Sequence, residues 1–182
     1  MPRKRTFQTF REARKVGPFA EMPMLPDEFQ LQVKLSRNDR AQPFYSLFAK
    51  DTMLVLMSGG GLIEFRGSSA EHFDLEPGDC IYVPAGTAHR LVHDTESAVL
   101  RYVPRSPLVE GAAWYCQTCG HELHREVWNT AETLSQDGYV AAFRAFNSSE
   151  NRRTCADCGS VHPPVDAAPF RWEEVAEQVR HG

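Results

Sequence analysis

Four of the five cysteines form two C-x-x-C-G motifs, Cys116/Cys119 and Cys155/Cys158. Two residues between the cysteines let a tight turn aim both sulfurs at one ion, and the following glycine relieves that turn. Four thiolates in this pattern are typical of a tetrahedral zinc or iron site. Because all four ligands come from the protein, such a metal has no open position, and its role is structural or in electron transfer.

Two other interpretations of the cysteines are a redox-active C-x-x-C pair and two small disulfides. Neither explains why the motif occurs twice with a glycine behind it, so we predict bound zinc or iron. Three histidines lie beside the cysteines, and with four sulfurs available we expect them to be neighbours rather than ligands: His121, His124 and His162.

The fifth cysteine, Cys80, stands alone far upstream, and we expect it to pack as a small apolar side chain in the interior. An odd cysteine count without a signal peptide indicates a reducing compartment, so we predict a cytoplasmic protein.

The chain has 182 residues and a net charge of −4. That charge argues against a nucleic-acid binder, and no apolar run is long enough to cross a membrane.

The elements that must position these residues are short strands. Alternating apolar and polar residues or short apolar runs bounded by Gly and Pro turns predict strands in 29–35, 43–50, 52–65, 72–94 and 97–103. Gly59, Gly60 and Gly61 suit the tight turn of a hairpin. Such spacing is typical of an all-β sandwich or barrel. Phe170, Val175 and Val179 could share one face of a terminal helix.

These patterns divide the chain into four parts. We expect an N-terminal segment at 1–28, a barrel at 29–105, a four-cysteine region at 106–165 packed on the barrel, and a C-terminal helix at 166–182. The four-cysteine region also holds a helix-capable stretch and the aromatic segment 139–146.

The segment from Gly78 to His93 carries a second chemical pattern. It reads G-x5-P-x-G-x2-H, with Pro84, Gly86 and His89 in place, followed by His93. This resembles the second cupin motif, in which His93 stands where the motif has Asn. Together with the four cysteines, the chain resembles bacterial-type 3-hydroxyanthranilate 3,4-dioxygenases. The resemblance implies a cupin (double-stranded β-helix, or jelly-roll) barrel with a small rubredoxin-like metal-binding appendage at its C-terminal side.

The family resemblance also implies chemistry. These enzymes cleave the ring of an aminophenol carboxylate with O₂ and an Fe(II) held by two histidines and a glutamate. His89 matches the histidine of the second motif. The other two ligand positions fall on Ser46 and Thr52, so the standard iron site is missing. If Thr52 points into the barrel, the neighbouring Asp51 points out, unless a bulge reverses the strand.

The remaining family positions give candidate catalytic and substrate-binding residues. By spacing, the resemblance places His93 and Arg101 at positions where the family has a substrate-binding arginine and a catalytic glutamate. Arg40 stands for the upstream arginine, and Tyr45 joins these as a substrate-binding candidate. A replacement metal site could also be built from a set of polar residues: His89, His93, Glu71, His72 and Asp51.

Three functions follow from these candidates. The first is a diverged enzyme that acts on a small acidic aromatic or amino-acid-derived metabolite without the standard iron, with His89, His93 and Arg101 as acid/base or binding groups. The second is a non-catalytic ligand-binding cupin: a sensor, a carrier or a pathway subunit. The third is a dioxygenase with an unusual ligand set. The resemblance implies a homodimer for all three.

Overall fold

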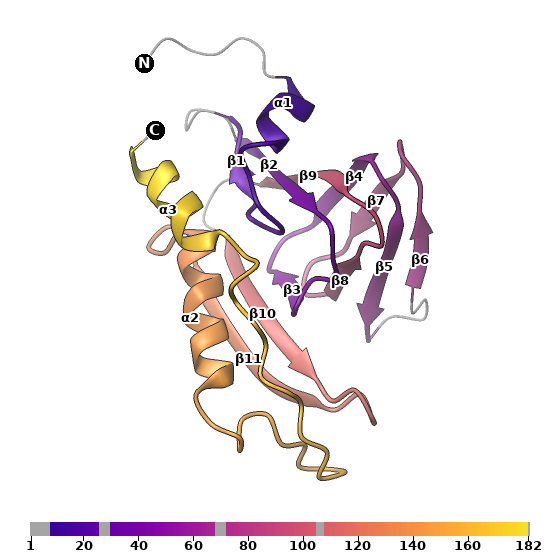
Figure 1. The fold of residues 1–182 in the computed structure, drawn as a ribbon, viewed down its shortest axis with the longest axis vertical. Helices are drawn as coiled ribbons and strands as arrows, with labels where there is room; N and C mark the ends of the chain where they lie inside the picture. Colours follow the sequence, from indigo (N-terminus) through magenta and orange to yellow (C-terminus); the bar gives the residue numbers. More distant parts are fainter. Residues whose placement is uncertain (1–7, 26–29, 68–71, 105–107, 182) are drawn as a thin grey trace.

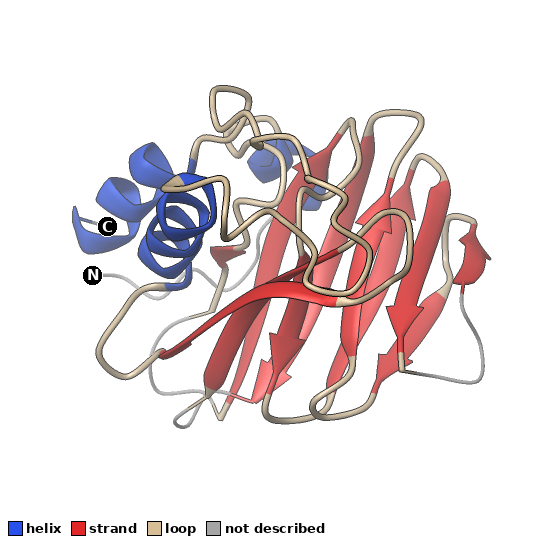
Figure 2. Ribbon diagram, turned by 90° about the horizontal axis from the view of Figure 1, so that it is seen from below, coloured by secondary structure: helices blue, strands red, loops and turns tan. Residues whose placement is uncertain are grey.

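The computed structural model describes residues 8–25, 30–67, 72–104 and 108–181. Its strands form two antiparallel sheets (Figures 1 and 2). The five-stranded sheet contains, in spatial order, β1 (Met22–Pro23), β2 (Leu31–Asn38), β9 (Ser97–Pro104), β4 (Thr52–Ser58) and β7 (Cys80–Val83). The six-stranded sheet contains β11 (Glu122–Asn129), β10 (Val109–Tyr115), β3 (Tyr45–Phe48), β8 (Ala88–Val92), β5 (Gly61–Arg66) and β6 (His72–Leu75).

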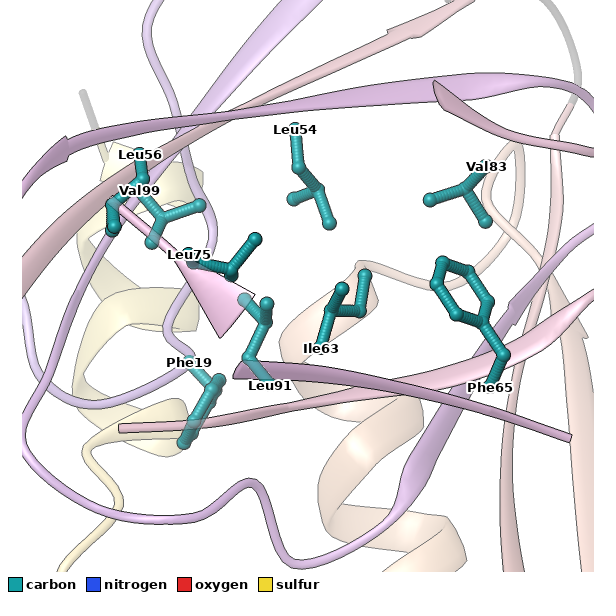
Figure 3. Close-up of a cluster of buried hydrophobic side chains, with 9 residues drawn as sticks. All are labelled: Phe19, Leu54, Leu56, Ile63, Phe65, Leu75, Val83, Leu91 and Val99. Atoms are coloured by element: carbon teal, nitrogen blue, oxygen red, sulfur yellow. The ribbon is translucent and has the colours of Figure 1, made fainter. Parts of the chain in front are cut away.

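The predicted strands between residues 30 and 104 are therefore confirmed, and their alternation places one face of each sheet inside. In β4, Thr52, Leu54 and Leu56 are buried, whereas Met53 between them is exposed. Apolar side chains from both sheets meet in one cluster, drawn in Figure 3. Phe19, which precedes the first strand, joins this cluster. The expected cupin barrel is the fold of the chain, with a four-cysteine cluster and a terminal helix beside it.

Close approach of two backbones explains the glycine at the start of β5. Gly61 has a φ of 148°, and a Cβ there would lie 2.2 Å from the carbonyl oxygen of Val92. Only glycine fits this contact, so the predicted β4–β5 hairpin brings β5 directly against the end of β8.

β2 is buried on both faces. Its apolar residues Val33 and Leu35 pack with Val16 and Val175 from the N-terminal segment and the terminal helix. Lys34, on the opposite face, is 7% exposed. The polar face of this strand therefore points into the barrel, which the alternation of the sequence does not reveal.

The six-stranded sheet continues beyond residue 105. β10 pairs with β3, and β11 pairs with β10, so the strands on either side of the expected boundary at 105/106 share one hydrogen-bonded sheet. The sequence analysis predicted neither β10 nor β11. The domain bounds themselves stay a prediction.

Two helices follow these strands. α2 (Ser135–Asn147) includes the aromatic segment 139–146 and packs on β10 and β11 through a cluster that contains Trp114, Trp128 and Phe146. α3 (Trp172–His181) is the predicted terminal helix, in which Val175 and Ala176 are fully buried. It begins after Phe170, so the prediction that Phe170 shares its face is wrong. Figure 2 shows both helices grouped to one side of the sheets. Within the described residues, no helix has the length and apolar character that a membrane crossing needs.

The described part of the N-terminal segment contains α1 (Thr9–Ala13) and then enters the barrel. Phe19 and Glu21 are buried and have positive φ angles of 51° and 47°. Such a backbone is costly for residues other than glycine, so the surroundings must hold it. Trp172 Nε1 donates to the carbonyl of Phe19 at 3.2 Å, and Gln136 Nε2 donates to that of Ala20 at 2.7 Å. We call residues 17–21 the N-terminal strap.

Candidate metal centre and barrel interior

Two backbone turns present the four cysteine sulfurs. In the first, Cys116 N donates to the carbonyl of His121 at 2.7 Å, and Gly120 N donates to that of Cys116 at 2.9 Å. The second turn repeats this pattern between Cys155, Ser160 and Gly159. Gly120 and Gly159 have φ angles of 79° and 74°, which confirms the reason given above for a glycine after each second cysteine.

The four sulfurs converge on one point. All four Sγ atoms lie within 4.8 Å of one another. Cys116 Sγ is 3.5 Å from Cys158 Sγ, and Cys119 Sγ is 3.5 Å from Cys155 Sγ. Tetrahedral coordination at a metal–sulfur distance of about 2.3 Å gives sulfur separations of about 3.8 Å, so zinc or iron fits. These pairs are free thiols at distances too long for a disulfide.

The neighbouring histidines make other contacts, as expected. His121 Nδ1 lies 2.8 Å from Asp157, and His124 Nε2 lies 3.1 Å from Glu126. Each sulfur therefore faces the shared point with the other three sulfurs, and the site is closed to other ligands.

The barrel interior has a different arrangement, centred on His89. This histidine is fully buried between the rings of Phe48 and Phe65. Its Nδ1 lies 3.0 Å from the carbonyl of Thr87, and its Nε2 lies 2.8 Å from Nη1 of Arg101. Because the guanidinium is always a donor, Nε2 accepts and the ring proton is on Nδ1. The lone pair of His89 is therefore already used by a cation.

Arg101 belongs to a buried ion network. Its Nε donates to Glu21 in the N-terminal strap at 2.7 Å. The other oxygen of that carboxylate accepts from Tyr139 at 2.8 Å and from Lys34 at 3.5 Å. Lys34 also pairs with Glu110 of β10. Two cations and two carboxylates thus neutralise one another inside the barrel.

The network shifts the pKa values of its members. Burial raises the pKa of Glu21, but Arg101 and Lys34 outweigh it and lower the value to about 2. Burial and the nearby Arg101 together lower the pKa of His89 to about 3. Burial also raises the pKa of Tyr139 well above its usual value. At neutral pH, Glu21 is therefore charged while His89 and Tyr139 are neutral.

An iron ion does not fit this interior. Ser46 lies directly opposite His89 on β3, and Thr52 points inward with an Oγ1 that has no hydrogen-bond partner. Asp51 points away, as expected, and accepts from the backbone N of Ala85 at 2.9 Å. Among the described residues, the four cysteines form the group of three or more ligand-type side chains close enough to hold a metal.

The structure separates the other predicted site residues. His93 lies beyond the end of β8, where Nδ1 is 2.9 Å from Ser97 Oγ and Nε2 is 3.4 Å from Asn38. Burial lowers its pKa. Arg40 is exposed and pairs with Asp39. Their catalytic and substrate-binding roles stay predictions.

Tyr45 lies on the outer face of its sheet, because it alternates with the inward-facing Ser46, and its hydroxyl donates to Glu64 at 2.7 Å. His72 is exposed at the start of β6, and Glu71 lies outside the described residues. The prediction for Cys80 is wrong. It is exposed on the edge strand β7, where its neighbours Ile81 and Val83 face the core.

Sequence reasoning did not find the other members of the network around Arg101. Glu21 and Tyr139 come from segments 80 and 38 residues away from it, and no local pattern links them. Lys34 gave no signal either, because the alternation of its strand places it on the polar face.

The chain was compared with known proteins. No family model matches it. It is 32% identical over 96 residues to the 3-hydroxyanthranilate 3,4-dioxygenase of Paraburkholderia phytofirmans, covering 51% of this chain and 54% of that enzyme. It is 30% identical over 141 residues to the enzyme of the same name from Jannaschia sp., covering 74% of this chain and 71% of that one.

The first of these relatives is matched over about half of its length. Among solved structures, hydroquinone 1,2-dioxygenase PnpCD in complex with Cd²⁺ and 4-hydroxybenzonitrile aligns with a TM-score of 0.47 and 17% identity, over 59% of this chain and 82% of that chain. The longer Jannaschia match includes most of both proteins. The chain belongs to the 3-hydroxyanthranilate 3,4-dioxygenase family.

Proposed function

We propose that this chain is a non-catalytic, ligand-binding cupin of its family, with a structural metal at the four cysteines and none in the barrel. The observation that carries the proposal is the 2.8 Å contact between Arg101 Nη1 and His89 Nε2. The one histidine that matches the family motif has its coordinating lone pair bound to a guanidinium.

Burial gives further support. His89 and Arg101 are 0% and 3% exposed. A substrate has no contact with either side chain while the N-terminal strap holds Glu21 against Arg101. A diverged enzyme acting on a small acidic aromatic through His89, His93 and Arg101 is the alternative, and it requires that the strap leave the barrel. A dioxygenase with an unusual ligand set requires in addition that Arg101 release His89.

Metal analysis of the purified protein separates these functions. The proposal expects about one zinc or iron per chain, lost in Cys116→Ser and retained in His89→Ala. It also expects no oxygen uptake with 3-hydroxyanthranilate. A second metal that disappears in His89→Ala, or oxygen uptake that depends on His89, would contradict the proposal and favour the dioxygenase. A homodimer is proposed on the family resemblance, and a cytoplasmic location on the odd number of cysteines.

A further inference from the structure

A groove of about 520 Å³ lies on the outer face of the six-stranded sheet. Tyr45, Glu64 and Arg90 line it from β3, β5 and β8, and Tyr115 lines it from the end of β10. Gln117 and His162 close it from the side of the cysteine turns. Its size is that of a small-molecule site. The groove is separate from the barrel interior, because Tyr45 and the inward-facing Ser46 lie on opposite faces of β3.

Two arginines line the groove, and they differ in their ionic partners. Glu64 accepts from Arg90 Nε at 2.6 Å and from the Tyr45 hydroxyl at 2.7 Å, so the charge of Arg90 is already balanced. Burial raises the pKa of Glu64, but the hydrogen bonds from Arg90 and Tyr45 outweigh it and lower the value. Glu64 is therefore ionised and engaged at neutral pH.

Arg66, the last residue of β5, is the second arginine. Its guanidinium carbon lies 5.1 Å from the ring centre of Tyr45 and 5.5 Å from that of Tyr115. It also reaches the first cysteine turn, since a Cβ at Gly120 would lie 3.5 Å from its Nη1. Two rings and a turn thus hold it at the groove. The carboxylate of Glu64 forms its ion pair with Arg90 and also feels the charge of Arg66. One carboxylate therefore faces two arginines, and these three groups together carry one net positive charge.

These features match one class of ligand. A planar guanidinium held on aromatic rings binds a carboxylate through two parallel hydrogen bonds. The two tyrosine rings stand edge to face, 5.1 Å apart at 82°. Tyr45 is 4% exposed and lies under the guanidiniums of both Arg66 and Arg90. The half-buried Tyr115 is therefore the ring that offers apolar surface next to that charge. A single charge matches a monoanion. We propose that this groove binds an aromatic monocarboxylate, with the carboxylate on Arg66 and the ring against Tyr115.

This inference names the ligand site and ligand class of the proposed binding function. Its experiment measures neither metal content nor oxygen uptake, so it fails or succeeds separately from the test of that function. If the groove does not bind and the metal analysis holds, the chain is a non-catalytic cupin whose ligand site lies elsewhere.

The experiment is calorimetric titration of the full-length metal-loaded protein with sodium benzoate. Benzamide is the neutral isostere, acetate is the carboxylate without a ring, and inorganic phosphate is the anion of a different class. Arg66→Gln is expected to weaken benzoate binding about 10–100-fold, the value of a lost charge-assisted hydrogen bond. Benzamide, acetate and phosphate are expected to bind at least about tenfold more weakly than benzoate.

Arg144→Gln is the matched control, because Arg144 is an exposed arginine of α2 outside the groove. It should bind benzoate as the unchanged protein does. In parallel, ¹H–¹⁵N spectra should show benzoate-induced shifts at Tyr45, Arg66 and Tyr115 and none at Arg101. The proposal is overturned by undetectable benzoate binding, by equal binding in Arg66→Gln, by equal affinity for acetate or phosphate, or by shifts confined to the barrel interior.

Discussion

Two regions of the described structure differ in what the lone pairs of their ligand-type residues face. At Cys116, Cys119, Cys155 and Cys158, four sulfurs converge within 4.8 Å of one another. Around His89, the lone pair of Nε2 accepts from Arg101 instead. A residue in a metal-binding motif is a ligand only if its donor atom remains available, and the partner that decides this can come from a distant strand.

The cysteine cluster and the barrel interior also differ in how their charges are balanced. Four thiolates at one point repel one another and need a cation between them. The barrel network needs none, because Arg101 and Lys34 already balance Glu21 and Glu110. One region is therefore completed by a metal and the other by its own side chains, and each prediction below tests one side of this difference.

The largest effect is expected for Cys116→Ser. It removes one ligand of the closed site, and structural zinc contributes about 10–16 kcal/mol of apparent binding free energy in small zinc domains. We expect the metal content to fall close to zero and the melting temperature to drop sharply, as measured by elemental analysis and calorimetry. Cys80→Ser is the control, because Cys80 is exposed and lies on β7, in the sheet that does not contain β10 and β11. Unchanged metal content in Cys116→Ser would show that the four sulfurs do not bind it.

Arg101→Met should have the next largest effect. It leaves Glu21 charged and buried without its closest partner, and breaking a buried ion pair from one side costs about 3–5 kcal/mol. Urea unfolding measures this loss. The double variant with Glu21→Gln should recover part of it, because no uncompensated carboxylate then remains. The metal content should stay unchanged in both variants. A loss of metal in Arg101→Met would mean that the two regions are not independent.

Acid should weaken the barrel through His89. Its pKa is about 3 in the folded protein and about 6.5 in an unfolded chain. Between these values only the unfolded chain binds the proton, so stability that is present above pH 6.5 is lost as the pH falls toward 3. Between pH 7 and 5 this loss is about 2 kcal/mol, since each pKa unit corresponds to about 1.4 kcal/mol.

Urea unfolding of His89→Gln at pH 7 and pH 5 tests this. The free energy of unfolding of this variant should depend less on pH than that of the unchanged protein. The control His181→Gln, at the exposed end of α3, should keep the pH dependence of the unchanged protein. Comparison with the control also removes the effect of acid on the metal site, which all three proteins share. An equal pH dependence in His89→Gln would place the acid sensitivity elsewhere.

Much of the fold could be predicted from the sequence, because it depends on local patterns. The alternation of Leu54 and Leu56, the Gly59–Gly61 turn and the spacing of the cysteines are all read within a few residues. β10 and β11 were missed. In β10, Glu110 faces the barrel network and Trp114 packs on Phe146 of α2, so no simple alternation marks the strand.

Only the part of the candidate site that depends on local sequence patterns could be predicted. The cysteine cluster follows from two local turns. The network around Arg101 instead combines the N-terminal strap, β2, β10 and α2, and residues such as Glu21 have no pattern that assigns them to a barrel. Lys34 illustrates the difficulty: alternation places it on the polar face of a strand, and only the tertiary fold turns that face inward.

For the last variant we expect no change in metal content, the smallest effect of the series. Ser46→His with Thr52→Glu restores the residue types that the family resemblance implies at the missing ligand positions. Ser46 lies directly opposite His89, and Thr52 points inward, so the new side chains would reach the same interior. We nevertheless expect no additional metal by elemental analysis, because Nε2 of His89 still accepts from Arg101. Adding Arg101→Gln removes the charged donor and should permit a second metal. The double variant, with Arg101 still in place, could instead bind a second metal. In that case the missing ligands, and not the arginine, explain why the barrel interior holds no metal.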